Sequence, residues 1–294
     1  MRPAARRGTL ARVRTANGLL AGVLVAGCAG APADEPVTLP FTADPGALGG
    51  EAYLCVGFDV AVLGGADLGG LALTLPTGPV ALHHVSLYAA PTAVPAGATP
   101  CTPMPTDAVP LHVWATGGEG LALPPDVALA IPPRTQQLVI QAHALRFGDG
   151  AAGAGALVLT PRFDAPIRAG WIPVRAPTPA LRPHHREDST ATCTLPAAVT
   201  LLSTWPHMHQ AGAAFHGALL TGGARTPLVD VVPWQFEAQR AYPLAVVAPA
   251  GAQLETHCTW QNDTDVTILP GPAITDEMCG QSLVAYPVEA ARCE

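Results

Sequence analysis

Proline and glycine are so frequent in this chain that they leave little room for long helices. The 294 residues include 32 prolines and 30 glycines. Proline removes a backbone donor and clashes inside a helix, and glycine lowers helix stability. Few stretches could therefore hold a long amphipathic helix. Beyond the first 28 residues, no run approaches the roughly 20 apolar residues that a membrane-spanning helix needs.

Short apolar runs recur between the Gly and Pro clusters, and this pattern predicts strands. Several short strands separated by turn signals are typical of antiparallel β-sandwiches. In the first half we expect strands at residues 53–60, 71–75, 81–89, 111–115, 127–131, 137–147 and 156–160. In the second half we expect them at residues 171–174, 198–209, 213–220, 228–234, 244–247 and 253–260.

The two series of strands predict two domains. Residues 161–170 form the expected connection, and the polar, Pro-rich residues 177–190 form an expected surface loop. Each half has about the commonest domain size, roughly 120 to 150 residues. We therefore predict an all-β protein with two antiparallel β-sandwich domains in tandem, at residues 49–165 and 166–294.

Residues 1–28 have the features of an export signal. Five arginines and no acidic residue precede a short apolar run, which leads to the sequence Val-Ala-Gly-Cys ending at Cys28. Lipoprotein signal peptidase cuts before cysteine in such a small-residue pattern. We expect Cys28 to be the lipid-anchored N-terminus of an exported protein of the cell envelope, followed by a tether over residues 29–48. An ordinary secretory signal with an incidental cysteine is the alternative.

Removal of the signal leaves an acidic protein. The signal holds 5 of the 15 basic residues and none of the 22 acidic ones, so the remainder has a charge of 10 − 22 = −12 with histidine neutral. Such a surface argues against nucleic acid or anionic lipid as a partner. The lipid anchor is thus the only membrane contact that we expect, and we expect a monomer.

Six further cysteines predict disulfides. They are Cys55, Cys101, Cys193, Cys258, Cys279 and Cys293. An even number in an exported chain indicates three bridges, which can be paired in 15 ways. If each half closes its own bridges, Cys55 pairs with Cys101 and the four later cysteines pair among themselves. Metal thiolates are a weaker alternative because the chain has no CxxC pair.

A His-x-His sequence and a methionine suggest a copper site in the second half. Side chains at i and i+2 of a strand lie on one face, so His207 and His209 can hold one ion, unless they are simply surface residues at a strand end. Met278 lies in a polar, turn-like stretch, which argues against a role as core filler. Thioether sulfur favours Cu(I), and two histidines with one methionine leave coordination positions open for oxygen or substrate.

The first half holds a second candidate site, made of His83, His84 and His143. Adjacent strand residues point to opposite faces, so His83 and His84 can bind one ion only at a bulge, a twist or a strand end. Alone, a His-His pair has no specific meaning. We expect His112, His216 and His257 to be structural, and His184 and His185 to face solvent.

Together, these motifs identify a family resemblance. In chain order they are His83-His84, Gln141-x-His143, His207-x-His209-x-x-Gly212 and Asp276-Glu277-Met278-Cys279. Over residues 37–294 the chain resembles the copper type II, ascorbate-dependent monooxygenases, which include peptidylglycine alpha-hydroxylating and dopamine beta-monooxygenases. The resemblance implies two jelly-roll-like β-sandwich domains, each with one copper ion, facing across a solvent-filled cleft.

The resemblance also implies roles. His83, His84 and His143 would hold an electron-transfer copper, whereas His207, His209 and Met278 would hold the catalytic copper that binds O2 and a small-molecule substrate. Ascorbate or a similar reductant would reduce both ions, and an unactivated C–H bond would be hydroxylated. The implied disulfides are Cys55–Cys101, Cys193–Cys293 and Cys258–Cys279.

Two departures from the family bear on the substrate. Peptide-hydroxylating members carry an arginine two positions before the His-x-His, and its guanidinium can pair with a substrate carboxylate. Trp205 occupies that position here, which disfavours a carboxylate-terminated peptide. Trp205 either contacts an apolar or aromatic substrate or packs structurally, and Gln141 is a candidate support for His143 or the substrate. Gly280 replaces a larger polar residue, so we expect a wider pocket.

Two other functions remain open on these residues. A non-catalytic copper-binding or copper-storage lipoprotein could use the same scaffold, although storage requires neither two unlike sites nor an open one. A zinc hydrolase could use the histidines, but it would leave Met278 unexplained. The copper-dependent monooxygenase is our leading hypothesis.

Overall fold

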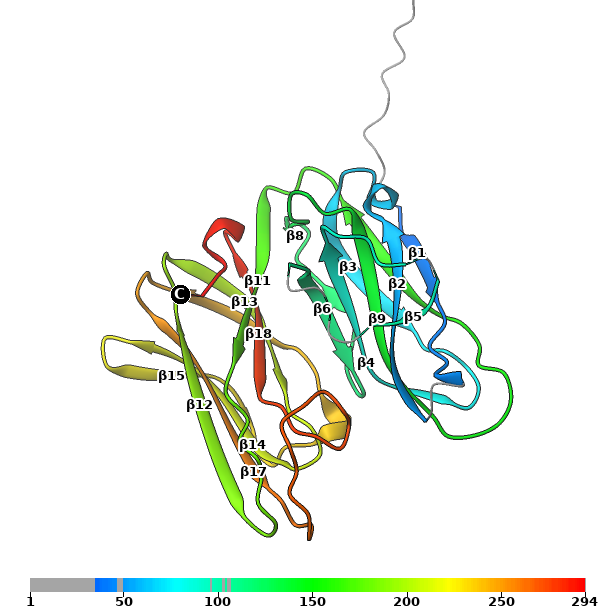
Figure 1. Cartoon of the computed structure of the whole chain (residues 1–294). Coiled ribbons are helices and arrows are strands. Elements are labelled where there is room, and N and C mark those ends of the chain that lie inside the picture. The colour runs from blue at the N-terminus through cyan, green and yellow to red at the C-terminus, as the bar shows by residue number, and fades with distance from the viewer. Residues whose placement is uncertain (1–34, 47–49, 96, 102–103, 105–106, 294) are drawn as a thin grey trace, which may run out of the picture. The chain divides into compact units, whose positions relative to one another are not determined.

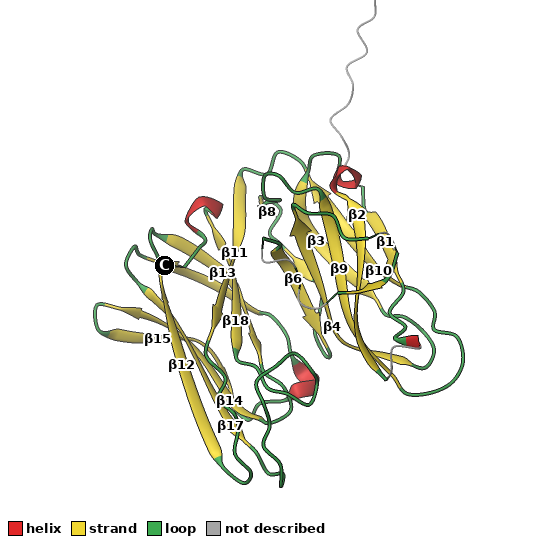
Figure 2. Cartoon of the chain, viewed as in Figure 1, coloured by secondary structure: helices red, strands yellow, loops and turns green. Residues whose placement is uncertain are grey.

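The computed structural model of the chain describes residues 35–46, 50–95, 97–101, 104 and 107–293. It is all-β, with strands throughout and only short 3₁₀ turns between them (Figure 2). The expected signal and the lipidated Cys28 lie outside the described residues. Within the part that is described, no helix is long and apolar enough to cross a membrane.

The longest sheet has nine strands and runs through both halves of the sequence. Its strands lie in the order β1, β10, β3, β8, β11, β18, β13 and β16, and β7 pairs with β3. Their bounds are β1 Val37–Phe41, β3 Asp67–Thr74, β7 Leu121–Ala122, β8 Val127–Leu129, β10 Gly155–Arg162, β11 Ile167–Arg175, β13 Val199–His207, β16 Tyr242–Ala248 and β18 Gly280–Tyr286.

Two smaller sheets complete the fold, one in each half of the sequence (Figure 1). The first has the order β5, β2, β9, β4 and β6, with bounds Thr99–Pro100, Glu51–Asp59, Gln137–Arg146, Val80–Ala90 and Val109–Ala115. The second has the order β12, β17, β14 and β15, with bounds Arg186–Thr194, Gln253–Gln261, Gly212–Thr221 and Ala224–Val231. Buried apolar side chains form a core in each half, including Leu87 and Leu159 in the first and Ile172 and Leu254 in the second.

β11 carries the long sheet from one half to the other. Its first three residues, Ile167–Ala169, pair in parallel with β8, and residues 170–175 pair antiparallel with β18. The expected connection at residues 161–170 is therefore mostly strand, since only residues 163–166 separate β10 from β11. The two halves share one hydrogen-bonded sheet.

Three expectations from the sequence need correction. The tether predicted over residues 29–48 includes β1, which pairs with β10 at the edge of the long sheet; an edge strand tolerates Pro40. The loop predicted over residues 177–190 ends in β12, whose polar residues alternate between exposed and half-buried positions. The C-terminal strand β18 was not predicted, although it pairs with both β11 and β13.

All three disulfides that the family resemblance implies are formed. They link Cys55 to Cys101, Cys193 to Cys293 and Cys258 to Cys279. The first lies in the N-terminal half and the other two in the C-terminal half, as expected if each half closes its own bridges.

Candidate metal centre and adjoining cavity

A β-bulge places both adjacent histidines of the first half beside His143. Leu82 of β4 pairs with Ala144 of β9 and His84 pairs with His143, so that His83 is the extra residue between two successive pairs. The bulge breaks the alternation that would otherwise send neighbouring side chains to opposite faces. As a result, one ring nitrogen of each of the three histidines lies within 4.8 Å of the others.

Glu51 and Tyr53 of β2 fix the orientation of the His143 ring. His143 Nε2 lies 2.6 Å from the Glu51 carboxylate, so Nε2 carries the hydrogen and Nδ1 keeps its lone pair. Tyr53 stacks on the ring with centroids 4.0 Å apart. The lone pair of His143 Nδ1 faces His83 Nδ1 at 2.9 Å, which is within hydrogen-bonding distance.

Burial keeps the histidines of this triad neutral. It lowers the pKa of His83 to about 2 and that of His84 well below its usual value, and neighbouring imidazoles lower both further. Burial also lowers the pKa of His143, against the effect of Glu51. Among the described residues, His83 Nε2 and His84 Nδ1 are buried without a hydrogen-bond partner. Neutral, unpartnered imidazole nitrogens are suited to binding a metal ion.

The second pair of histidines lies at the end of β13 rather than wholly within it. His207 is the last residue of the strand, whereas His209 lies beyond it. This corrects the expectation of two ligands on one strand face: the His209 backbone N–H donates to the Glu277 side chain, not to a neighbouring strand. The two rings still meet edge to face, with centroids 5.1 Å apart.

Hydrogen bonds leave Nε2 of both rings free. His207 Nδ1 donates to Gln239 Oε1 at 2.7 Å, and the Gln239 amide nitrogen donates to the Phe236 carbonyl, which fixes the orientation of the amide. His209 Nδ1 donates to the Asp276 carbonyl at 2.9 Å. His209 Nε2 is buried and has no partner among the described residues. Burial lowers the pKa of His207 to about 3, and it also lowers that of His209.

Glu277 ties the His209 segment to the loop that carries Met278. Its buried carboxylate accepts from the backbone N–H groups of His209, Ala211 and Met278 at 3.0, 2.6 and 3.2 Å, and from Trp260 Nε1 at 2.9 Å. Burial raises the pKa of Glu277 to about 7, against the four donors, which lower it. One side chain thus positions two of the predicted ligands.

A cavity of about 440 Å³ adjoins both sets of ligands. His84, His207 and Met278 line it, so at least one residue of each predicted site faces the same space. Trp205 and Gln141 line it as well. Trp205 is 8% exposed and stacks on His207 with centroids 5.1 Å apart, while the Gln141 amide donates to the Cys101 carbonyl at 3.0 Å. Trp205 therefore both packs on a ligand and forms part of the cavity wall.

The two sets of histidines adjoin one another. The ring of His83 lies 5.0 Å from that of His209 and 6.3 Å from that of His207, between centroids. This differs from the solvent-filled cleft that the family resemblance implies. The Ile274 N–H donates to Glu51 at 3.1 Å and the Tyr53 hydroxyl donates to the Pro272 carbonyl at 2.5 Å. These bonds hold the loop before Met278 against β2.

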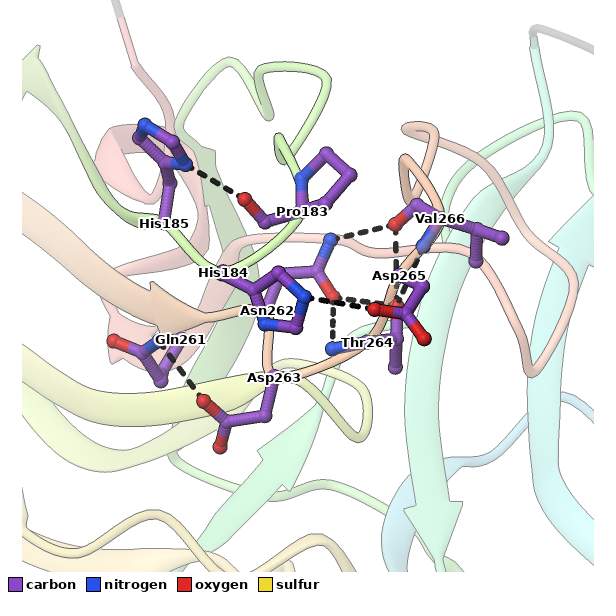
Figure 3. Close-up of polar contacts among 9 residues, drawn as sticks. All are labelled: Pro183, His184, His185, Gln261, Asn262, Asp263, Thr264, Asp265 and Val266. Atoms are coloured by element: carbon purple, nitrogen blue, oxygen red, sulfur yellow. Dashed lines mark hydrogen bonds and ion pairs between the residues drawn. The ribbon is translucent and has the colours of Figure 1, made fainter.

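The remaining histidines lie outside this cluster. His112 is buried, whereas His216 and His257 bond to Asp230 and Thr190. His184 and His185 are exposed, as expected. Figure 3 shows them on a loop held beside residues 261–266: His184 pairs with Asp265, and Asn262 donates to the Val266 carbonyl.

Sequence reasoning missed three supporting residues. Glu51, Gln239 and Glu277 hold His143, His207 and His209, from which they are separated by 92, 32 and 68 residues. Glu51 and Gln239 lie in no motif with the histidines that they hold, so the sequence does not indicate their supporting role. Glu277 lies next to Met278, so its position in the Asp-Glu-Met-Cys motif was the one available signal.

Comparison with known proteins adds one informative match. Residues 170–294 match the family model described as copper type II ascorbate-dependent monooxygenase, C-terminal domain. No curated protein matches the chain. Solved structures with some similarity include an allantoicase, with 10% identity over 72% of this chain and 74% of that chain and a TM-score of 0.18. The Gt strain of infectious bursal disease virus gives 12% identity over 85% and 70%, with a TM-score of 0.19. At these TM-scores neither likeness carries an argument.

Proposed function

Since residues 170–294 match the C-terminal domain of copper type II ascorbate-dependent monooxygenases, we propose that the chain is a copper monooxygenase. It would hydroxylate an unactivated C–H bond of a small organic substrate, with O2 and an ascorbate-type reductant. The observation that carries the proposal is the cluster of five buried or half-buried imidazoles, which adjoin one another and share a cavity with Met278.

The donor atoms suit two copper ions of unlike surroundings. His83, His84 and His143 offer three neutral nitrogens close enough to bind one ion. His207 and His209 offer two Nε2 lone pairs, and Met278 would add the soft sulfur that favours Cu(I). In each set at least one imidazole donates its other N–H to a carboxylate, amide or carbonyl oxygen, an arrangement typical of metal-ligating histidines.

The chain's own residues would orient these ligands and receive the substrate. Bound copper, once reduced, would supply the electrons and activate O2. Glu51 and Gln239 hold His143 and His207 in single tautomers. Glu277 accepts from the backbone N–H groups of His209 and Met278 and so holds the two segments that carry these ligands. The cavity beside His207 and Met278 is large enough for a small organic molecule.

We also propose that the protein is exported and anchored through Cys28. The Val-Ala-Gly-Cys sequence and the arginine-rich start support a lipoprotein signal. Three disulfides fit an oxidising compartment.

The test of the monooxygenase activity is oxygen uptake with ascorbate after copper loading. Met278→Leu keeps an apolar side chain of similar size but removes the sulfur, so we expect it to lower uptake by roughly 100-fold. Met104→Leu is the matched control, because Met104 lines the same cavity and is not a predicted ligand. We expect nearly unchanged uptake in that variant and two copper ions per chain in the wild type.

The alternatives predict different results. Two bound copper ions with no oxygen uptake under any condition would favour a copper-storage lipoprotein. A single zinc ion by metal analysis would favour a hydrolase. Equal uptake by wild type and Met278→Leu would contradict the role of the thioether.

A further inference from the structure

Among the described residues that line the cavity, Arg175 is the only charged side chain. It is exposed, and within the described part of the chain it has no hydrogen bond or ion pair. Four other arginines are paired with carboxylates: Arg146 with Asp44, Arg168 with Asp67, Arg182 with Glu187 and Arg225 with Glu255. What distinguishes Arg175 is that it combines the absence of such a partner with a position in the cavity wall. Its guanidinium is therefore free for a ligand.

The sheet register places Arg175 on the same face as His207. Gly280 of β18 pairs with Arg175 on one side and with His207 on the other. Directly paired residues project to the same face, and neighbouring strands lie about 4.8 Å apart, so the two backbones are roughly 10 Å apart. A Cβ at Gly280 would meet no atom within 4 Å. Open space thus lies over Gly280, on the strand between those that carry Arg175 and His207.

The walls around this space are mainly apolar or uncharged. Trp205 and Ser282 form the next row of the same sheet face, because they pair with each other two residues along. Across the cavity, Ser86 and Tyr88 of β4 also line it. Arg175 and a hydrogen bond from Ser86 lower the pKa of Tyr88, but burial raises it more, so the phenol stays neutral. A neutral hydroxyl near a guanidinium can add a second donor for an anion.

We propose that Arg175 binds a carboxylate of the substrate, which is a small carboxylic acid with an apolar or aromatic body. The body would lie along Trp205 and over Gly280, so that its far end reaches the space beside His207 and Met278. Position 205 is a tryptophan here, but the cavity still has a cation, because Arg175 lies on another strand of the same wall. The claim that this acid is hydroxylated rests on the proposed monooxygenase function. The claim that Arg175 binds its carboxylate does not.

Binding is tested by calorimetric titration of copper-loaded protein without reductant, so that no turnover occurs. The probes are 3-phenylpropanoate and 3-phenylpropanamide, which share a body and differ in charge. We expect the wild type to prefer the carboxylate, and Arg175→Gln to weaken its binding roughly 10-fold while changing amide binding little. Arg175→Lys should restore part of the preference, and added salt should reduce it. Arg186→Gln, an exposed arginine outside the cavity, is the matched control.

Several results would overturn the assignment. They are equal affinity of the wild type for the two probes, no detectable binding of the carboxylate, or an equal loss in Arg175→Gln and Arg186→Gln. The outcome is separable from that of the proposed function. Selective carboxylate binding that depends on Arg175, together with no ascorbate-dependent oxygen uptake, would support the inference and contradict the monooxygenase activity.

Discussion

Glu277 offers the sharpest test of how the second ligand set is held. Four N–H donors converge on its carboxylate, and all four groups would lose their partner in Glu277→Ala. A buried donor without a partner costs about 1–3 kcal/mol, so four cost about 8 kcal/mol at the central value. The rise of the pKa to about 7 is already net of these four hydrogen bonds, so it is not a separate amount to subtract; it shows that removing the buried charge offsets part of the loss. We therefore take the lower end of the range, about 1 kcal/mol for each donor, and expect Glu277→Ala to lower the free energy of unfolding by about 4 kcal/mol.

The assay is urea unfolding of the copper-free protein at pH 8, followed by circular dichroism. Glu277→Gln keeps one acceptor oxygen and removes the buried charge, so we expect its stability to lie within about 2 kcal/mol of the wild type. Glu255→Ala removes one ion pair with Arg225 near the surface and should cost less than about 1 kcal/mol. A loss below about 2 kcal/mol in Glu277→Ala would refute the reasoning, and so would equal losses in the two Glu277 variants.

Two further predictions concern other parts of the chain. Burial lowers the pKa of His112 from 6.5 to about 4, so between these pH values the unfolded chain binds a proton that the folded one does not, and stability falls as the pH falls. His112→Leu should reduce the dependence of the unfolding free energy on pH by up to about 1.4 kcal/mol per pH unit, as measured by urea titrations at several pH values. Exposed His185→Asn is the control. An unchanged pH dependence in His112→Leu would argue against a buried neutral His112. For export, we expect labelled palmitate to be incorporated by the wild type but not by Cys28→Ser in expressing cells, and label in both proteins would contradict the anchor.

Residue type and local spacing were enough to predict the second ligand set, and its metal stays a prediction. Met278 in a polar stretch and the His-x-His spacing pointed to a soft metal site without any structure. The adjacent pair His83-His84 is different, because both residues can bind one ion only at a bulge, and neither residue predicts a bulge. The structure forms that bulge at His83, where β4 shifts its register against β9.

Features that depend on register or on distant contacts could not be predicted. Arg175 reaches the cavity only because β18, a strand not expected from the sequence, lies between it and His207. β12 was missed because one of its faces is exposed and polar, so the apolar alternation that marks other strands is absent. Glu51 lies 92 residues from His143, and such a pairing has no local signature.

The shared strand β11 makes the two halves mechanically dependent. This strand of nine residues spans roughly 30 Å, and it pairs with β8 on one side over its first three residues and with β18 on the other over the following six. β11 is anchored to β8 at Ile167–Ala169 and ends at Arg175 in the cavity wall. We therefore expect a displacement of β11 at its first-half end to be passed along the strand to the guanidinium at its other end. A substitution beside Ile167, far from any predicted ligand, is thus a way to change the cavity without touching its lining.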